Sequence, residues 1–354
     1  MITTITVSAI VIIFAVFMLA WRIRFAGRGN FFNNYFSIDE TRAIKGMCAV
    51  FILFSHICTY LADYFPSFFL FKYAGAIMVG GFFFISGYGL QYGVMNRENY
   101  LRGFFKKRLL TIAVPYYIIN AFYIVTNEME RDAIIRSLFG FYLWYVMAIT
   151  IFYIGFYLCN KLFKPKSSPI AMTVFILLYI IIMLKLNFGY WWFNSCLAFA
   201  AGIWFCRLFK GFTAFFKKQW HLKLILCAAV FAVTYYYYCH HANDTTLICL
   251  LVTLVNTTVF SVMLAVLAMK IQINNPILRI CGDLSLELYL THALWITWLR
   301  VGTIHSATGT LFDNNVMYLI GIVAGTFTMS LAVHTVSGVI LGNRRKILEN
   351  RAKV

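Results

Sequence analysis

Ser55 and His56 are two polar side chains at the end of an apolar run that follows Lys45. Ser37 and Glu40 predict the start of a helix before that run, as the two members of a capping box. At 1.5 Å per residue, the eleven steps from Lys45 to His56 cover about 16 Å, roughly half of a bilayer's hydrocarbon core. Neutral imidazole accepts protons near pH 7, and ionisable groups at such depth are usually functional. The stretch therefore predicts a proton-transfer site inside a membrane. The alternative is that His56 only forms a hydrogen bond between two helices.

Other polar side chains are expected at a depth similar to that of His56. Counting from the ends of their apolar runs places Ser86, His292 and His334 about 12–16 Å from one membrane face, with Glu287 nearer the surface. For Ser86 the alternative is plain hydrogen bonding between helices. For His334 we favour a structural role.

Ser285, Tyr289 and His292 are spaced four and three residues apart. On a helix this spacing puts them on one face. Because polar groups are costly in lipid, that face is expected to point into a helix bundle. For Tyr289, too, helix–helix hydrogen bonding is the alternative to a catalytic role.

The composition indicates a chain that spans a membrane many times. The 354 residues are 62% hydrophobic and only 12% charged, whereas soluble domains carry about 25% charged residues. Further apolar runs predict an all-α protein with about eleven spans, near residues 3–20, 43–62, 74–94, 109–126, 138–159, 169–185, 190–206, 222–239, 246–269, 284–300 and 316–341. Gly89-x-x-x-Gly93 and Gly321-x-x-x-Gly325 are expected to allow close helix packing.

The basic residues orient these spans. With eleven spans and the N-terminus outside, 25 of the 30 Lys and Arg fall on the cytoplasmic side, and the C-terminus is cytoplasmic. This rule accounts for the formal net charge of +18 without nucleic acid as a partner. The nine Cys form no CxxC pair, so we expect neither a disulfide framework nor a metal site.

Several segments, taken in order, resemble the acyltransferase-3 family of integral-membrane O-acyltransferases. They are Lys45-x10-His56, where the family usually has Arg first; Gly81-Phe-Phe-Phe-Ile-Ser-Gly-Tyr88; Phe104-Phe-Lys-Lys-Arg-Leu-Leu with Pro115-Tyr116; Leu143-Trp144-Tyr145; and Gly282-Asp-Leu-Ser285-Leu-Glu-Leu-Tyr289-Leu-Thr-His292. The resemblance implies a ten-helix membrane domain over residues 37–342. Residues 1–30 would then add an extra N-terminal helix and basic linker, and residues 343–354 a basic cytoplasmic tail.

The resemblance also implies a reaction. The expected activity is transfer of an acyl group, most simply acetyl from acetyl-CoA as co-substrate, to a hydroxyl of a cell-surface polysaccharide, glycolipid or precursor. His56 would be catalytic, and Lys45 would hold the donor. The further catalytic candidates are His292, Ser86, Tyr289 and Glu287. The further candidates for binding the phosphates of coenzyme A are Lys107, Arg108 and Arg42. For the basic cluster around Lys107 and Arg108, anchoring by the positive-inside rule alone is an equally good explanation.

A proton-coupled secondary transporter of a small anion or sugar is the competing hypothesis. Buried His and Glu also form proton relays in transporters. Transporters, however, commonly show internal repeats and spans broken at the midplane, whereas this chain shows no repeat and places only Pro115 in the interior of a span. We expect a multi-pass protein of the cell membrane, in bacteria the cytoplasmic membrane; the sequence does not indicate an oligomeric state.

Overall fold

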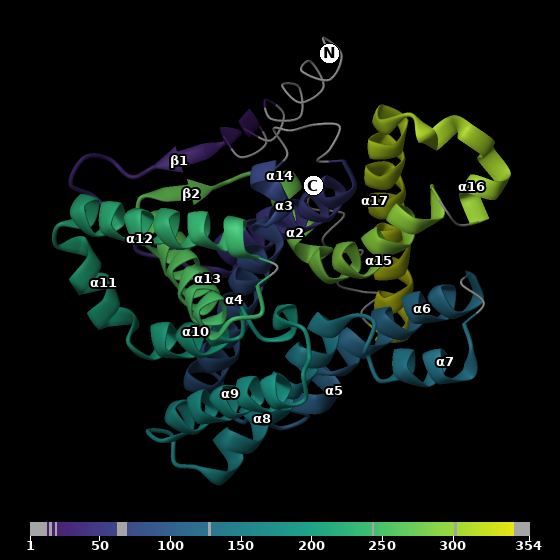
Figure 1. The fold of residues 1–354 in the computed structure, drawn as a ribbon. Helices are drawn as coiled ribbons and strands as arrows, with labels where there is room; N and C mark the ends of the chain where they lie inside the picture. Colours follow the sequence, from purple (N-terminus) through teal and green to yellow (C-terminus); the bar gives the residue numbers. More distant parts are fainter. Residues whose placement is uncertain are drawn as a thin grey trace. The chain divides into compact units, whose positions relative to one another are not determined.

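A computed structural model describes residues 20–61, 69–126, 129–242, 244–300 and 303–342, together with positions 13, 16 and 17. The chain divides into two compact units. Figure 1 labels the helices and strands of both units. Unit 1 holds residues 1–101 and 154–283, and unit 2 holds residues 102–153 and 284–354. The predicted N-terminal span and the basic tail lie outside the described residues, apart from those few positions.

Unit 1 is a helical bundle with one short strand pair. Its helices are α2 (Ile38–Leu61), α3 (Phe69–Lys72), α4 (Ala74–Asn96), α9 (Ser168–Lys185), η2 (Tyr190–Trp192), α10 (Leu197–Arg207), α11 (Phe209–Lys217), α12 (Trp220–His241), α13 (Leu247–Ala268) and α14 (Pro276–Asp283). Strands β1 (Ile23–Phe25) and β2 (Ile271–Ile273) pair antiparallel, with Arg24 opposite Gln272. This pair is a small departure from the all-α prediction.

Unit 2 consists of α5 (Phe104–Arg108), α6 (Leu110–Thr126), α7 (Arg131–Leu138), α15 (Ser285–Trp298), α16 (Thr303–Thr308), η3 (Gly309–Asp313) and α17 (Asn315–Ile340). Helix α8 (Trp144–Leu162) contains the division between the units. Asn314 caps α17, since its side-chain oxygen accepts the N–H of Val316 at 2.9 Å. The long α17 packs on both α15 and α6.

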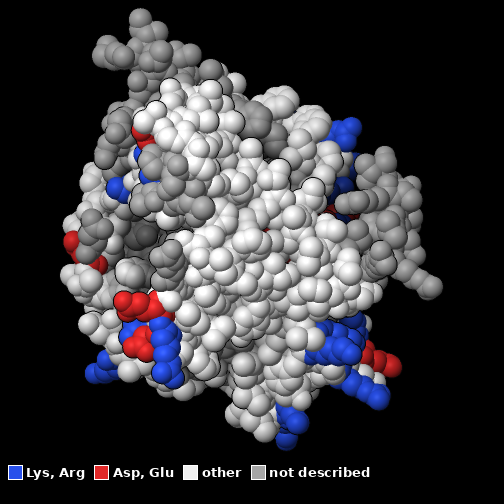
Figure 2. Space-filling view, turned by 90° about the vertical axis from the view of Figure 1, so that its right-hand side faces the viewer, with Lys and Arg blue, Asp and Glu red and all other residues white. Residues whose placement is uncertain are grey.

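The described residues include seven helices long and apolar enough to cross a membrane, or eight if the sharply bent pair α10–α11 is one span. The seven are α2, α4, α8, α9, α12, α13 and α17, and each overlaps a predicted span. The predicted spans near 109–126, 190–206 and 284–300 correspond to the shorter helices α6, α10 and α15. Figure 2 shows Lys and Arg in separate clusters with broad uncharged surface between them. The chain is therefore a polytopic helical membrane protein, while the count of eleven and the orientation stay predictions.

Glycines allow the closest helix contacts in unit 1. A Cβ on Gly46 would lie 1.7 Å from the Leu278 carbonyl oxygen, and one on Gly282 would lie 1.9 Å from that of Arg42. These two glycines press α2 against α14. The Gly87 and Gly202 pair does the same for α4 and α10.

Of the glycines expected to allow close helix packing, one packs against a neighbouring side chain and another does not. Gly325 lies against the Trp295 ring, as expected, but Gly89 is exposed, and a Cβ added to it would have no atom within 4 Å. The prediction for Gly89 is wrong because its position on α4 faces away from the neighbouring helices.

The predicted capping box of α2 is half present. The Glu40 N–H donates to Ser37 Oγ at 3.3 Å, which confirms the cap. The Glu40 carboxylate does not return to Ser37 but accepts the Ile273 N–H at 2.8 Å. Because β2 supplies that donor, Glu40 ties the start of α2 to the strand pair.

Candidate functional site

Arg42 is held by protein carboxylates at the start of α2. Its Nε donates to Asp283 Oδ1 at 2.7 Å, and its Nη2 donates to Asp283 Oδ2. Asp39, one turn earlier, lies 3.5 Å from Nη1. This forked contact joins α2 to the end of α14, so Arg42 serves the packing of unit 1 in this structure.

Lys45 follows one turn later on the same helix and is partly exposed. Its neighbour Gly46 presses against the Leu278 carbonyl, so the backbone at Lys45 is fixed by the contact between α2 and α14. A cation on a rigid helix is suited to hold an anionic ligand at a defined place.

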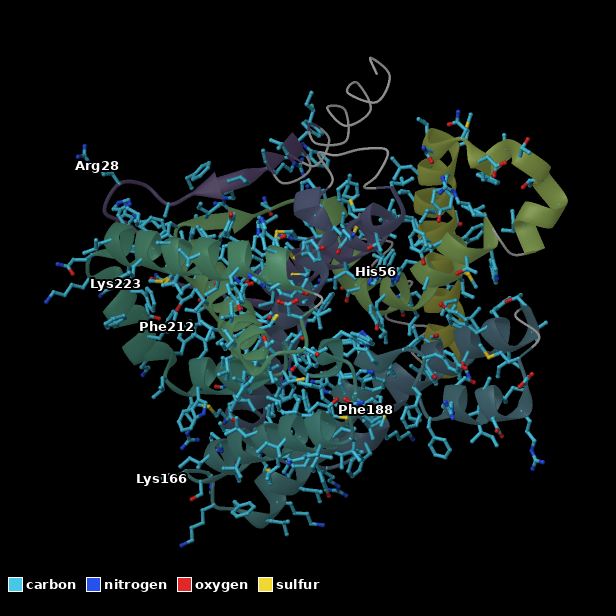
Figure 3. The ribbon with its side chains drawn as sticks, in the orientation of Figure 1. Arg28, His56, Lys166, Phe188, Phe212 and Lys223 are labelled. Carbon is cyan, nitrogen blue, oxygen red and sulfur yellow. The ribbon has the colours of Figure 1, made fainter. Side chains whose placement is uncertain are left out.

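His56, labelled in Figure 3, lies three turns further along α2. It is exposed, although most of its neighbours on the helix are buried. The helix is fixed immediately before it. Ser55 Oγ donates to the Lys72 carbonyl at 2.8 Å and accepts the Gly75 N–H at 3.1 Å, which ties α2 to the start of α4. His56 is thus an accessible imidazole on a firmly held helix.

Ser86 lies on α4 at a different level from His56. Gly75 faces Ser55 and Gly81 faces Cys48, so α2 and α4 run antiparallel. Continuing this register places Ser86 opposite the turn that contains Lys45. The expected common depth of Ser86 and His56 is therefore wrong. In this register α4 continues past the start of α2, so equal counts from the two helix ends do not give equal depths.

The basic cluster lies in unit 2. Lys107 on the short helix α5 is exposed and Arg108 is partly exposed. Gly103 precedes the helix with φ at +67°, a conformation that glycine adopts without strain. Arg42 and Lys45 belong to unit 1, so these four candidates for donor binding are divided between the units.

The predicted face of α15 points inward in unit 2. Tyr289 and His292 are buried, and Ser285 is partly buried. The Tyr289 ring meets the ring of Tyr145 edge-on, with centroids 5.2 Å apart. His292 Nδ1 lies 3.2 Å from the Leu288 carbonyl oxygen. Because a carbonyl only accepts, Nδ1 carries the proton in this contact and Nε2 is the basic nitrogen.

Glu287 and His334 form a pair that the sequence did not predict. Glu287 Oε1 lies 2.9 Å from His334 Nδ1, which joins α15 to α17. One turn along, the hydroxyls of Thr291 and Ser330 lie 2.8 Å apart. The sequence favours a structural role for His334; its carboxylate partner Glu287 lies 47 residues earlier on another helix, so only the tertiary contact reveals it.

The comparison with known families agrees with the resemblance seen in the motifs. A family model described as an acyltransferase domain, that of the acyltransferase-3 family, matches residues 35–334. No curated protein and no solved structure shows a significant match. The matched range includes α2, α4 and α15 and ends at His334. Since the match covers most of the chain, the chain belongs to the acyltransferase-3 family and is a membrane acyltransferase.

Proposed function

We propose that the protein transfers acetyl from cytosolic acetyl-CoA to a hydroxyl of a cell-surface polysaccharide, a glycolipid or a precursor of either. One observation carries this proposal: Lys45 and His56 lie on the continuous helix α2, about 16 Å apart along its axis. In a membrane acyltransferase this arrangement fits a cation near the aqueous donor and a base at about half the depth of the membrane.

His56 is the proposed general base. Its imidazole accepts the proton of the acceptor hydroxyl while the oxygen attacks the acyl carbon. The tetrahedral intermediate then expels coenzyme A as a thiolate, because the electron pair of the C–S bond passes to sulfur. The accessible position of His56 on α2 supports this role.

The remaining candidates would hold the two substrates. Lys45 of unit 1 is the proposed partner of the coenzyme A phosphates, which approach from the cytoplasm, and Lys107 and Arg108 of unit 2 are further candidates for the same role. Arg42 could join them only by leaving Asp283, to which it is bound twice. Ser86, Glu287, Tyr289 and His292 are the candidate groups for positioning the acceptor hydroxyl and the developing oxyanion.

The proposal is tested in two steps. Mass spectrometry of surface glycans from bacterial cells with and without this protein should show an acetyl group that depends on it. The purified protein in lipid should then release coenzyme A from acetyl-CoA only when glycan from the deletion cells is added. Unchanged glycans, or ion flux without an acceptor and without coenzyme A release, would contradict the proposal and favour a transporter.

A further inference from the structure

A guanidinium lies just beyond the end of α15 in unit 2. Arg300 follows Trp298, the last residue of α15, by two positions and is partly buried. Its Cζ lies 4.0 Å from the centroid of the Tyr318 ring, and its Nη2 donates to Asn315 Oδ1. Tyr318 is 1% exposed, and its hydroxyl donates to the Ile296 carbonyl at 2.9 Å. The ring beneath the guanidinium is therefore fixed between α15 and α17.

Most of the hydrogen-bonding capacity of Arg300 is unused. A guanidinium has five N–H donors, and the contact with Asn315 is the one side-chain hydrogen bond that Arg300 makes to the described residues. Its Nε is buried without a partner. No carboxylate in the described part of the chain forms an ion pair with Arg300, although the exposed Asp313 lies only two residues before Asn315. The positive charge is thus held in place but not neutralised.

Arg42 in unit 1 shows how this protein neutralises another partly buried arginine. Arg42 donates from Nε and Nη2 to the two oxygens of Asp283. Arg300 has the neutral amide of Asn315 and the Tyr318 ring in place of a carboxylate. Charged groups taken partly out of water are usually paired with an opposite charge. Arg300 is therefore prepared for an anion that the described residues do not supply.

The position of Arg300 indicates where that anion comes from. The predicted topology places Arg300 outside, where it leaves only five of the 30 Lys and Arg. Coenzyme A approaches from the cytoplasm in the proposed function, so the acceptor is the substrate on this side. His292, a candidate for positioning the acceptor hydroxyl, precedes Arg300 by eight residues, about 12 Å at the rise of an α-helix. The anion is therefore expected on the acceptor.

We propose that Arg300 binds an oxyanion of the acceptor, so that the protein selects acidic glycans or precursors that carry a carboxylate or a phosphate. This proposal rests on the proposed function and narrows its substrate class. A planar guanidinium donates two parallel N–H groups to such an oxyanion. Tyr318 fixes the plane of the guanidinium, and Asn315 holds one edge of it. Arg300 determines specificity by binding and takes no part in the transfer of the proton or of the acetyl group.

The test measures acceptor binding without acetyl-CoA, so that no transfer takes place. Purified protein is placed in nanodiscs of phosphatidylcholine, which has no net charge. Glycan from cells lacking the protein is added untreated, with its carboxyl groups reduced to alcohols, or dephosphorylated. We expect wild-type protein to bind the untreated glycan about 10- to 100-fold more tightly than one of the treated forms, the range for hydrogen bonds to charged groups. The treatment that weakens binding identifies the oxyanion.

Two variants remove the free charge in different ways. Arg300→Gln lacks the charge, whereas Asn315→Asp keeps Arg300 and places a carboxylate of the protein beside Nη2. Both should bind untreated glycan about 10- to 100-fold more weakly than wild type does. Asn315→Asp should unfold at the wild-type temperature or above, because Asp is favourable in the first turn of α17. Arg131→Gln, which removes an exposed arginine of α7 assigned to the same side, should keep wild-type affinity.

Four results would overturn the oxyanion site. They are equal affinity of wild-type protein for all three forms of the glycan, an equal loss in Arg131→Gln, wild-type affinity in Asn315→Asp, and a dependence on Arg300 that appears only when phosphatidylglycerol is added to the nanodiscs. The second would indicate general attraction by positive charge, the third a role of Arg300 in the fold alone, and the fourth a lipid headgroup as its ligand.

Release of coenzyme A separates this proposal from the proposed function. Wild-type protein that releases coenzyme A when glycan is added, but binds that glycan independently of Arg300, would refute the oxyanion site alone. Binding of untreated glycan that depends on Arg300, without release of coenzyme A from acetyl-CoA, would support the site and refute the proposed transfer.

Discussion

Arg42 and Lys45 are two cations one turn apart on α2 that have different surroundings. Arg42 is bound by Asp283 and Asp39, whereas Lys45 follows the packed turn at Gly46 and is partly exposed. From the sequence, both cations are candidates for holding coenzyme A, and Lys45 is favoured because the family motif falls on it. The structure separates them because Asp283 is 241 residues away and only the fold brings it to Arg42.

This difference predicts opposite phenotypes. Lys45→Ala should weaken binding of coenzyme A, measured by calorimetry, and leave the melting temperature close to wild type, because Lys45 lies at a partly exposed rim. Lys45→Arg should be tolerated because Arg is the usual family residue. Unchanged donor affinity in folded Lys45→Ala protein would remove Lys45 from the donor site.

Arg42→Ala is the matched comparison. It should lower the free energy of unfolding by about 0.2–1 kcal/mol, the range for partly exposed ion pairs, and change donor affinity less than Lys45→Ala does. A larger loss of donor affinity in Arg42→Ala would mean that Arg42 leaves Asp283 to bind coenzyme A.

At the scale of the helices, glycine positions decide how closely the bundle packs. Gly87 on α4 would place a Cβ 2.1 Å from the Phe199 carbonyl oxygen of α10, while Gly89, two residues on, has open space. The spacing of glycines in the sequence pointed to Gly89, since spacing does not tell which side of a helix meets a neighbour. Only the tertiary contacts show which glycines face a neighbouring helix, as Gly46, Gly87, Gly202 and Gly282 do.

Gly87→Ala and Gly89→Ala form a matched pair. Gly87→Ala should lower the free energy of unfolding by about 1–3 kcal/mol, because the added methyl forces α4 and α10 apart. Gly89→Ala should leave stability unchanged or raise it by up to about 1 kcal/mol, since alanine favours an exposed helix. Thermal unfolding in detergent measures both, and equal effects of the two substitutions would contradict the assigned contact.

At the scale of the whole chain, hydropathy predicted the membrane class and the place of the helices, because apolar runs of span length have no other stable environment. It did not predict which runs form shorter helices, as in α6 and α15, or the strand pair of β1 with β2. It also missed the contact of Glu287 with His334, because a pairing between distant helices leaves no local pattern. The order of the motifs along the chain identified the family, whereas hydropathy and helix spacing alone do not identify one.

The topology remains a prediction with a direct test. In a background without native Cys, Glu130→Cys and Thr310→Cys should react with a membrane-impermeant thiol reagent added outside cells. Asn99→Cys should react only after the cells are opened, because residue 99 lies in a predicted cytoplasmic loop rich in Lys and Arg. Outside labelling at position 99 would overturn the assigned orientation.

The central claim is that His56 is the base of acyl transfer, and His56→Gln tests it most directly. Gln keeps hydrogen-bonding capacity but has no nitrogen that titrates near neutral pH, so a structural His is partly rescued by it and a base is not. For folded His56→Gln protein with unchanged coenzyme A binding, we predict a rate of glycan-dependent coenzyme A release about 10²–10⁴-fold below wild type. A rate near that of wild type would contradict the claim and make His292 the next candidate.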